Sequence, residues 1–184
     1  DAGQLTQTYE CAKASGIMGG CTLTDAKEAM MEQNGLYTRL SKTAGFNCDV
    51  SKYAPFPGPA GKDIVEMACS NRPDGGVGVF GGPNDKPIVY DCARAPIAGY
   101  RCSFTKLDTN SYGPVTADLK AVGKASCAVS NARIIGKTAK GTTYMEVACA
   151  DGLKGYVLEY TAELKPIEAI GCAFSGQCKL PGNT

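Results

Sequence analysis

The chain has 184 residues, ten cysteines, no histidine and no tryptophan, and its 19 basic residues nearly balance 18 acidic ones. The lack of histidine excludes Ser-His-Asp and Cys-His nucleophile systems, histidine-ligated metal sites and histidine pH switches. The charge balance provides no basic surface for nucleic acid. No apolar run reaches the roughly 18 residues that a membrane-spanning segment needs. We therefore expect a globular protein with neither a nucleic-acid partner nor a membrane-spanning segment.

The first half of the chain predicts one helix followed by strands. Asp25, with Glu28 three residues later, is a helix start signal, and apolar residues recur near helical spacing as far as Leu40, with an expected interruption at Asn34-Gly35. Alternating apolar residues and intervening turn residues then predict antiparallel strands near residues 64–69, 77–80 and 88–90. The expected unit is a helix that covers one face of a small sheet.

The second half repeats the first at a shift of about 80 residues. Residues 9–14 (YECAKA) recur as residues 90–95 (YDCARA), and residues 65–69 (VEMAC) recur as residues 145–149 (MEVAC). A shorter helix near Pro114 and Leu119 precedes the second set of strands. The period is too long for a solenoid repeat, so a tandem duplication explains it better.

The predicted fold class is α+β, a disulfide-stapled tandem duplication of a helix plus a three- or four-stranded antiparallel sheet. A truncated third copy follows the second, because Cys172 lies 80 residues after Cys92 and begins a shortened loop that ends at Cys178. The predicted domains are a first repeat with its N-terminal Cys loop, a second repeat, and a truncated third Cys loop with the tail, over residues 1–91, 92–171 and 172–184.

Cysteine spacing favours disulfides over metal ligands. No Cys-x-x-Cys pair occurs, whereas zinc ribbons, iron–sulfur runs and thioredoxin-like motifs need close pairs. We therefore expect oxidising surroundings, a periplasmic or extracellular location, and a secretory leader removed before Asp1. Because short Cys loops recur three times and the other cysteines lie on consecutive strands, the predicted pairs are Cys11–Cys21, Cys48–Cys69, Cys92–Cys102, Cys127–Cys149 and Cys172–Cys178.

Candidate catalytic groups are few. Glu66 and Glu146 occupy the same place in each copy, which raises the possibility of paired acid and base carboxylates. We expect them instead to be exposed strand residues. No P-loop, Gly-x-Ser-x-Gly or dinucleotide fingerprint occurs, and the predicted pairing leaves no cysteine over as a nucleophile. The sequence therefore predicts no enzyme, no catalytic residue, no metal and no cofactor.

One loop of the first copy has the composition of a partner-binding element. Tyr53, Pro55, Phe56 and Pro57 form an aromatic and proline-rich stretch that has no counterpart in the second copy. Such stretches dock into grooves of partner proteins, although a stiff hairpin tip would have the same composition. These four residues are the predicted partner-binding site.

Two resemblances follow from these residues. The order of elements, a helix followed by two cysteines on consecutive strands, resembles the layout of the secreted β-lactamase-inhibitory proteins, which are tandem units of similar size. The cysteines concerned are Cys48 with Cys69 and Cys127 with Cys149. The extra Cys loops depart from that pattern. The two Cys-x-Val-Ser segments and residues 146–152 (EVACADG) are similar to uncharacterised duplicated Cys-rich exported proteins of alphaproteobacteria. The second resemblance implies export but no activity.

The predicted function is that of a non-enzymatic exported binding or structural protein. We expect its partner to be another protein or further copies of itself, in an extracellular, filamentous or membrane-associated assembly. Two alternatives stay open. One is a secreted inhibitor of a hydrolase, and the other is an enzyme that uses carboxylates without histidine.

Overall fold

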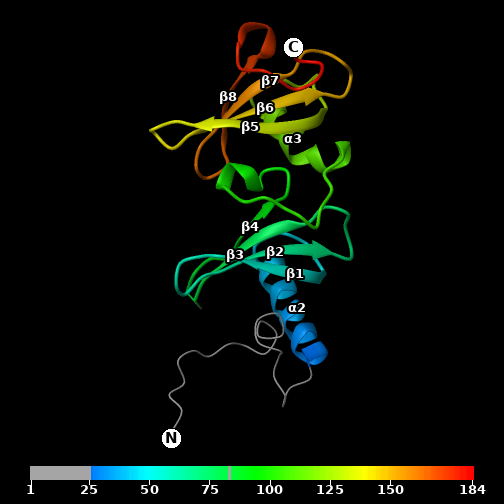
Figure 1. Ribbon diagram of the computed structural model, residues 1–184, viewed down its shortest axis with the longest axis vertical. Helices are drawn as coiled ribbons and strands as arrows, with labels where there is room; N and C mark the ends of the chain where they lie inside the picture. Colours follow the sequence, from blue (N-terminus) through cyan, green and yellow to red (C-terminus); the bar gives the residue numbers. More distant parts are fainter. Residues whose placement is uncertain (1–25, 83) are drawn as a thin grey trace, which may run out of the picture.

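The computed structural model of the protein describes residues 26–82 and 84–184, which form two α+β units (Figure 1). Each unit has one helix and one four-stranded antiparallel sheet with its strands in chain order. The two units follow one another along the longest axis of the molecule (Figure 1). The predicted fold class, a duplicated helix-plus-sheet unit, is confirmed.

The first unit contains helix α2 and strands β1–β4. Its elements are α2 (Ala26–Thr43), β1 (Val50–Phe56), β2 (Asp63–Cys69), β3 (Gly76–Phe80) and β4 (Ile88–Asp91). The helix is continuous through Asn34-Gly35, so the predicted interruption is wrong. Its C-terminal half lies on the sheet, where Tyr37 and Ser41 are fully buried. Packing against the sheet there offsets the weak helix propensity of the Asn-Gly pair.

The second unit repeats this arrangement with a shorter helix. Its elements are α3 (Gly113–Ala121), β5 (Val129–Lys137), β6 (Thr143–Cys149), β7 (Tyr156–Tyr160) and β8 (Pro166–Gly171). Pro114 stands in the first turn of α3, where its missing N–H costs no hydrogen bond. Short 3-10 helices η1 (Ala95–Ala98), η2 (Thr109–Tyr112) and η3 (Cys172–Phe174) lie in the connections.

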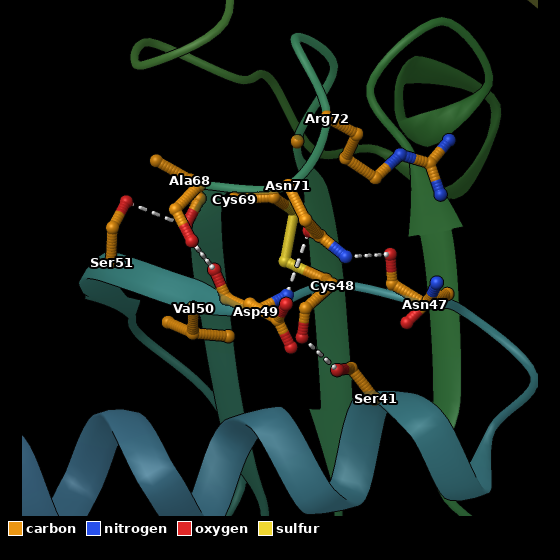
Figure 2. The surroundings of a disulfide bond; sticks show 12 residues. Ser41, Asn47, Cys48, Asp49, Val50, Ser51, Ala68, Cys69, Asn71 and Arg72 are labelled. Carbon is orange, nitrogen blue, oxygen red and sulfur yellow. Dashed lines mark hydrogen bonds between the residues drawn. A yellow bond between two sulfur atoms is a disulfide. The ribbon is translucent and has the colours of Figure 1, made fainter.

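Equivalent disulfides tie the first two strands of each sheet together. Cys48–Cys69 and Cys127–Cys149 both span Cα–Cα distances of 5.1 Å. In the first unit, Ser41 Oγ of α2 donates a hydrogen bond to the carbonyl oxygen of Cys48 (Figure 2). Helix and sheet are thus joined at the disulfide. Cys92–Cys102 and Cys172–Cys178 are also formed. All four pairs are as predicted, and Cys11 and Cys21 lie outside the described residues.

Each helix covers one face of its sheet. Beneath α2 the core contains Tyr37, Met67 and Phe80, and beneath α3 it contains Leu119 and Tyr160. On the opposite face of the first sheet, Ala95 from the segment between Cys92 and Cys102 packs with Ile64 and Val77. The first sheet is therefore covered on both faces. No helix among residues 26–82 and 84–184 is long and apolar enough to cross a membrane.

Candidate functional site: buried carboxylates, the junction and the chain ends

Two disulfide-closed Cys loops, Cys92–Cys102 and Cys172–Cys178, follow the last strands of the two sheets. Each begins with the same backbone hydrogen bond to the residue directly before the third strand, from the Cys92 N–H to the Gly75 carbonyl at 3.2 Å and from the Cys172 N–H to the Gly155 carbonyl at 2.9 Å. A Cβ atom at Gly75 or Gly155 would overlap a carbonyl oxygen of the second strand. Glycine at these turns is therefore required for close approach of the backbones.

Glu66 of β2 holds the chain as it leaves the first Cys loop. Its side chain is 1% exposed and accepts hydrogen bonds from the N–H groups of Ser103 and Phe104, both at 2.6 Å, and from the Ser103 hydroxyl at 2.8 Å. The prediction of an exposed strand glutamate is wrong here. The strand's second face is not solvated, because the chain returns over it after Cys102.

Glu146 of β6 does the same at the second Cys loop. It is 0% exposed and accepts hydrogen bonds from the N–H groups of Lys179 and Leu180 at 2.8 and 2.7 Å and from the Asn183 amide at 2.9 Å. Arg133 forms an ion pair with its other oxygen. The prediction of exposure is wrong for Glu146 also. We call Glu66 and Glu146, with the backbone that each binds, the carboxylate clamps.

The hydrogen bonds of Glu146 determine whether its carboxylate can take part in proton transfer. Burial by itself would raise the pKa of Glu146, but the hydrogen bonds from Asn183, Leu180 and Lys179 outweigh burial and hold that pKa below its ordinary value. A carboxylate kept ionised by fixed donors is a poor general acid, because a general acid or base needs a pKa near the working pH. Glu146 therefore fastens the second Cys loop and is a poor proton-transfer group.

A polar network joins the two units where the first Cys loop meets α3. Arg94 lies between two carboxylates, 2.6 Å from Asp91 and 3.4 Å from Asp118, and the hydroxyl of Tyr160 donates to Asp118 at 2.9 Å. Burial and the charge of Asp118 raise the pKa of Tyr160, which keeps the phenol protonated as a donor. The same loop places Ala93 in the core of the second unit. The junction therefore combines apolar packing with charged hydrogen bonds.

The predicted partner-binding residues are divided between the two faces of β1. Tyr53 packs edge-on against Tyr37 of the helix with ring centroids 5.0 Å apart, whereas Phe56 packs against Tyr100 on the other face at 5.6 Å. Both rings are half-buried, and Pro55 and Pro57 are exposed. The structure thus brings the two aromatic side chains into separate packing contacts and not into one surface.

Two other features could suggest a ligand site. Glu146 lies within 4.8 Å of the sulfur atoms of Cys172 and Cys178, but these are joined in a disulfide and offer no thiolate to a metal. A groove of about 530 Å³ at the junction includes Arg101 and Arg133. None of the described residues that line it is an aspartate or glutamate. It therefore offers no acid–base pair.

The ends of the molecule carry exposed apolar side chains. At the C-terminal end Phe174 of η3 is 89% exposed and Ile170 of β8 is 45% exposed. In the first unit a groove of about 630 Å³ is bordered by Leu36 and Leu40 of α2 and by Phe80 of β3, among other residues. Neither surface was predicted. In the preceding Cys loop the place of Phe174, two residues after the first cysteine, is taken by Arg94, so the repeat offered no signal for this surface.

The clamps, by contrast, had a signal in the sequence that we misinterpreted. Glu66 and Glu146 are conserved between the two copies within strands whose other residues are apolar, a pattern that fits a buried and partnered carboxylate. No family model, curated protein or solved structure matches the chain. The two resemblances drawn from the sequence stay predictions.

Proposed function

We propose that the protein is a non-enzymatic structural or binding subunit of an exported protein assembly. The four disulfides within the described part of the chain fit maturation in an oxidising compartment, and a periplasmic or extracellular location is part of the proposal. The carrying observation is the junction, where one Cys loop contributes to the sheet packing of the first unit and to the core of the second.

A junction of this kind fixes two units in one orientation. Ala95 packs on the first sheet, Ala93 enters the second core, and Arg94 is held by a carboxylate from each unit. The most deeply buried acids are occupied by structural hydrogen bonds. A stiff two-unit body whose polar groups are used internally suits extended contact with other protein surfaces more than it suits catalysis.

Native purification from the source, with cross-linking before lysis and mass spectrometry of what stays bound, tests this proposal. We expect stoichiometric recovery with a protein assembly or with further copies of the chain. A chain that elutes alone as a monomer and cross-links to nothing would contradict the proposal. Turnover of a substrate by the purified chain, lost in a Glu66→Gln variant whose circular dichroism shows that the fold is retained, would favour an enzyme instead.

A further inference from the structure

The junction of the two units contains the groove of about 530 Å³. One side is formed by the first Cys loop and the segment that follows it, including Tyr100, Arg101 and Leu107, and the other side by Arg133 and Ile134 of β5. Ligands bind preferentially where two folded units meet. Because both units contribute walls, the groove exists only while the junction holds the units together.

The apolar walls of the groove are fixed by their own packing. Tyr100 is half-buried, and its ring centroid lies 5.6 Å from that of Phe56 and 6.2 Å from that of Tyr90. Leu107 is 37% exposed, and Ile134 is half-buried. Side chains that are already held in place lose little freedom when a ligand covers them. The groove therefore offers a preformed apolar contact area.

Arg133 contributes a guanidinium group that the second clamp holds in position. Its Nε atom forms the ion pair with Glu146, and one Nη group donates a hydrogen bond to the carbonyl oxygen of Gln177 at 2.7 Å. A guanidinium group has five N–H donors, and the Arg133 side chain remains 32% exposed. Within the described residues the other donors of Arg133 are therefore available to a ligand in the groove.

Arg101 contributes the second guanidinium group and a charge that the groove does not balance. Arg101 is exposed, and no hydrogen bond or ion pair joins its side chain to another residue of 26–82 or 84–184. The charge of Arg133 is balanced by Glu146, whereas none of the described lining residues is an aspartate or glutamate that could balance Arg101. The groove therefore has an excess of positive charge.

Two arginines beside an aromatic wall fit a protein segment that carries a carboxylate. A guanidinium group binds a carboxylate through two parallel hydrogen bonds, and its weak hydration makes it suited to protein interfaces. Tyrosine and arginine are also the residue types that most often dominate the energy of an interface. Because β5 is an edge strand of its sheet, a groove beside it suits an extended segment.

From these features we infer that the junction groove binds an extended acidic segment of another protein. A carboxylate of that segment lies against Arg101 and Arg133, and a neighbouring apolar side chain lies against Tyr100 and Leu107. The positive excess favours an acidic segment over a basic one, and the apolar walls favour a protein segment over an inorganic anion. This inference rests on the proposed function as a binding subunit and names the chemistry of its partner.

The first experiment places a photocross-linking side chain in the groove of the full, oxidised chain. p-Benzoylphenylalanine replaces Leu107, and the cells that produce the chain are irradiated before lysis. We expect one dominant cross-linked protein, whose linked peptide contains an aspartate or glutamate beside an apolar residue. The same replacement at Leu153, which is 59% exposed in the β6–β7 connection, is the control and should not cross-link to that peptide.

A charge reversal then measures the contribution of Arg101. A labelled synthetic peptide with the sequence of the cross-linked segment is titrated with the purified full chain and followed by fluorescence anisotropy. We expect Arg101→Glu to weaken binding at least tenfold, and added salt to weaken binding by the wild type. Arg39→Glu is the matched control, because Arg39 is an exposed arginine of α2 outside this groove. The control should bind like the wild type.

A compensating exchange completes the test of the charge. The peptide with its acidic residue changed to lysine should bind Arg101→Glu more tightly than it binds the wild type. Circular dichroism must show that Arg101→Glu retains the fold. If that variant does not fold, Leu107→Glu introduces a negative charge from the same side of the groove and takes its place.

The outcomes separate this contact from the broader proposal. The inference would be overturned if the groove cross-links to a peptide without an acidic residue, to a second copy of this chain, or to nothing while native purification still recovers an assembly. Equal affinity of Arg101→Glu and the wild type for the peptide would overturn it too. Each of these results leaves a structural role standing. A chain that cross-links to nothing and is purified alone contradicts both proposals.

Discussion

The two units share their frame and differ at the surfaces that face the next unit. Both sheets have a bulge one residue after the first paired residue of the first strand, at Val50/Lys52 and at Val129/Asn131. Both second strands carry a buried glutamate. The position of Asp118 on α3, which binds Arg94 of the first Cys loop, is nevertheless occupied by Leu40 on α2, as the equivalent hydrogen bonds of Thr38 and Thr116 indicate. Duplication preserved the positions that hold the sheet together and left the contact positions free to diverge.

The second unit is also less completely covered than the first. In the first unit the segment between Cys92 and Cys102 covers the second sheet face with Ala95 and Tyr100. The two cysteines of the equivalent loop are six residues apart in the second unit, whereas those of the first loop are ten residues apart. Ile170 and Phe174 remain exposed as a result. The four predictions that follow test this comparison, from the largest expected effect to the smallest.

Removal of the second clamp should have the largest effect on stability. Glu146→Ala removes the acceptor of the Lys179 and Leu180 N–H groups and leaves Arg133 with only the Gln177 carbonyl oxygen as an acceptor among the described residues, and loss of one partner of a buried charged group costs about 3 to 5 kcal/mol. Denaturant unfolding should show this loss, with the exposed Glu168→Ala as control. Glu66→Ala should cost less, because no arginine among residues 26–82 and 84–184 forms an ion pair with Glu66. Equal losses in both units would contradict this comparison.

Removal of the strand-bridging disulfides should have similar effects in the two units. The loops closed by Cys48–Cys69 and Cys127–Cys149 span sequence separations of 21 and 22 residues, and opening a loop of that length costs about 3 kcal/mol in the chain-entropy account. Double Cys→Ser variants of each pair, compared by urea unfolding, measure this. A difference of several kcal/mol between them would show that the units differ in more than their surfaces.

The ion pair at the junction should contribute less to the free energy of unfolding than the Glu146 clamp or a strand-bridging disulfide. Asp118→Asn weakens the ion pair with Arg94 and should lower the free energy of unfolding by about 1 to 2 kcal/mol, with loss of cooperativity between the units. Lys120→Gln, on the exposed side of the same helix, is the matched control. Separate unfolding transitions for the two units in the variant, and one transition in the wild type, would be the clearest confirmation. An unchanged midpoint would show that apolar packing alone holds the junction.

The acid limb of the stability profile should show the smallest effect. The pKa of Glu146 lies below its ordinary value of 4.5 in the folded protein, so its contribution is fully present above that value and is lost as the pH falls through the lowered value. The slope from one such group is at most about 1.4 kcal/mol per pH unit. We therefore measure the free energy of unfolding from pH 6 to pH 2.5. Below pH 4.5 it should fall less steeply with decreasing pH in Glu146→Gln than in the wild type.

Much of the frame could be predicted because it follows from local pattern and repetition. Alternating residues predicted β2 and β6, and equal spacing in the two copies predicted that Cys48 pairs with Cys69 and Cys127 with Cys149. The continuity of α2 through Asn34-Gly35 was missed, because the helix is stabilised there by its contact with β1, including a hydrogen bond from the Asn34 amide to Ser51 at 3.3 Å.

The sequence by itself determined the duplicated α+β frame, the cysteine pairs that the structure describes and the exclusion of histidine chemistry. Only the tertiary structure decided which face of each strand is covered. Glu66 and Glu146 look exposed from their alternation, since periodicity distinguishes two faces but does not show what returns over them. The segments that bury these carboxylates lie more than 30 residues further along the chain. Contacts of that range depend on how the Cys loops fold back, which no local pattern records.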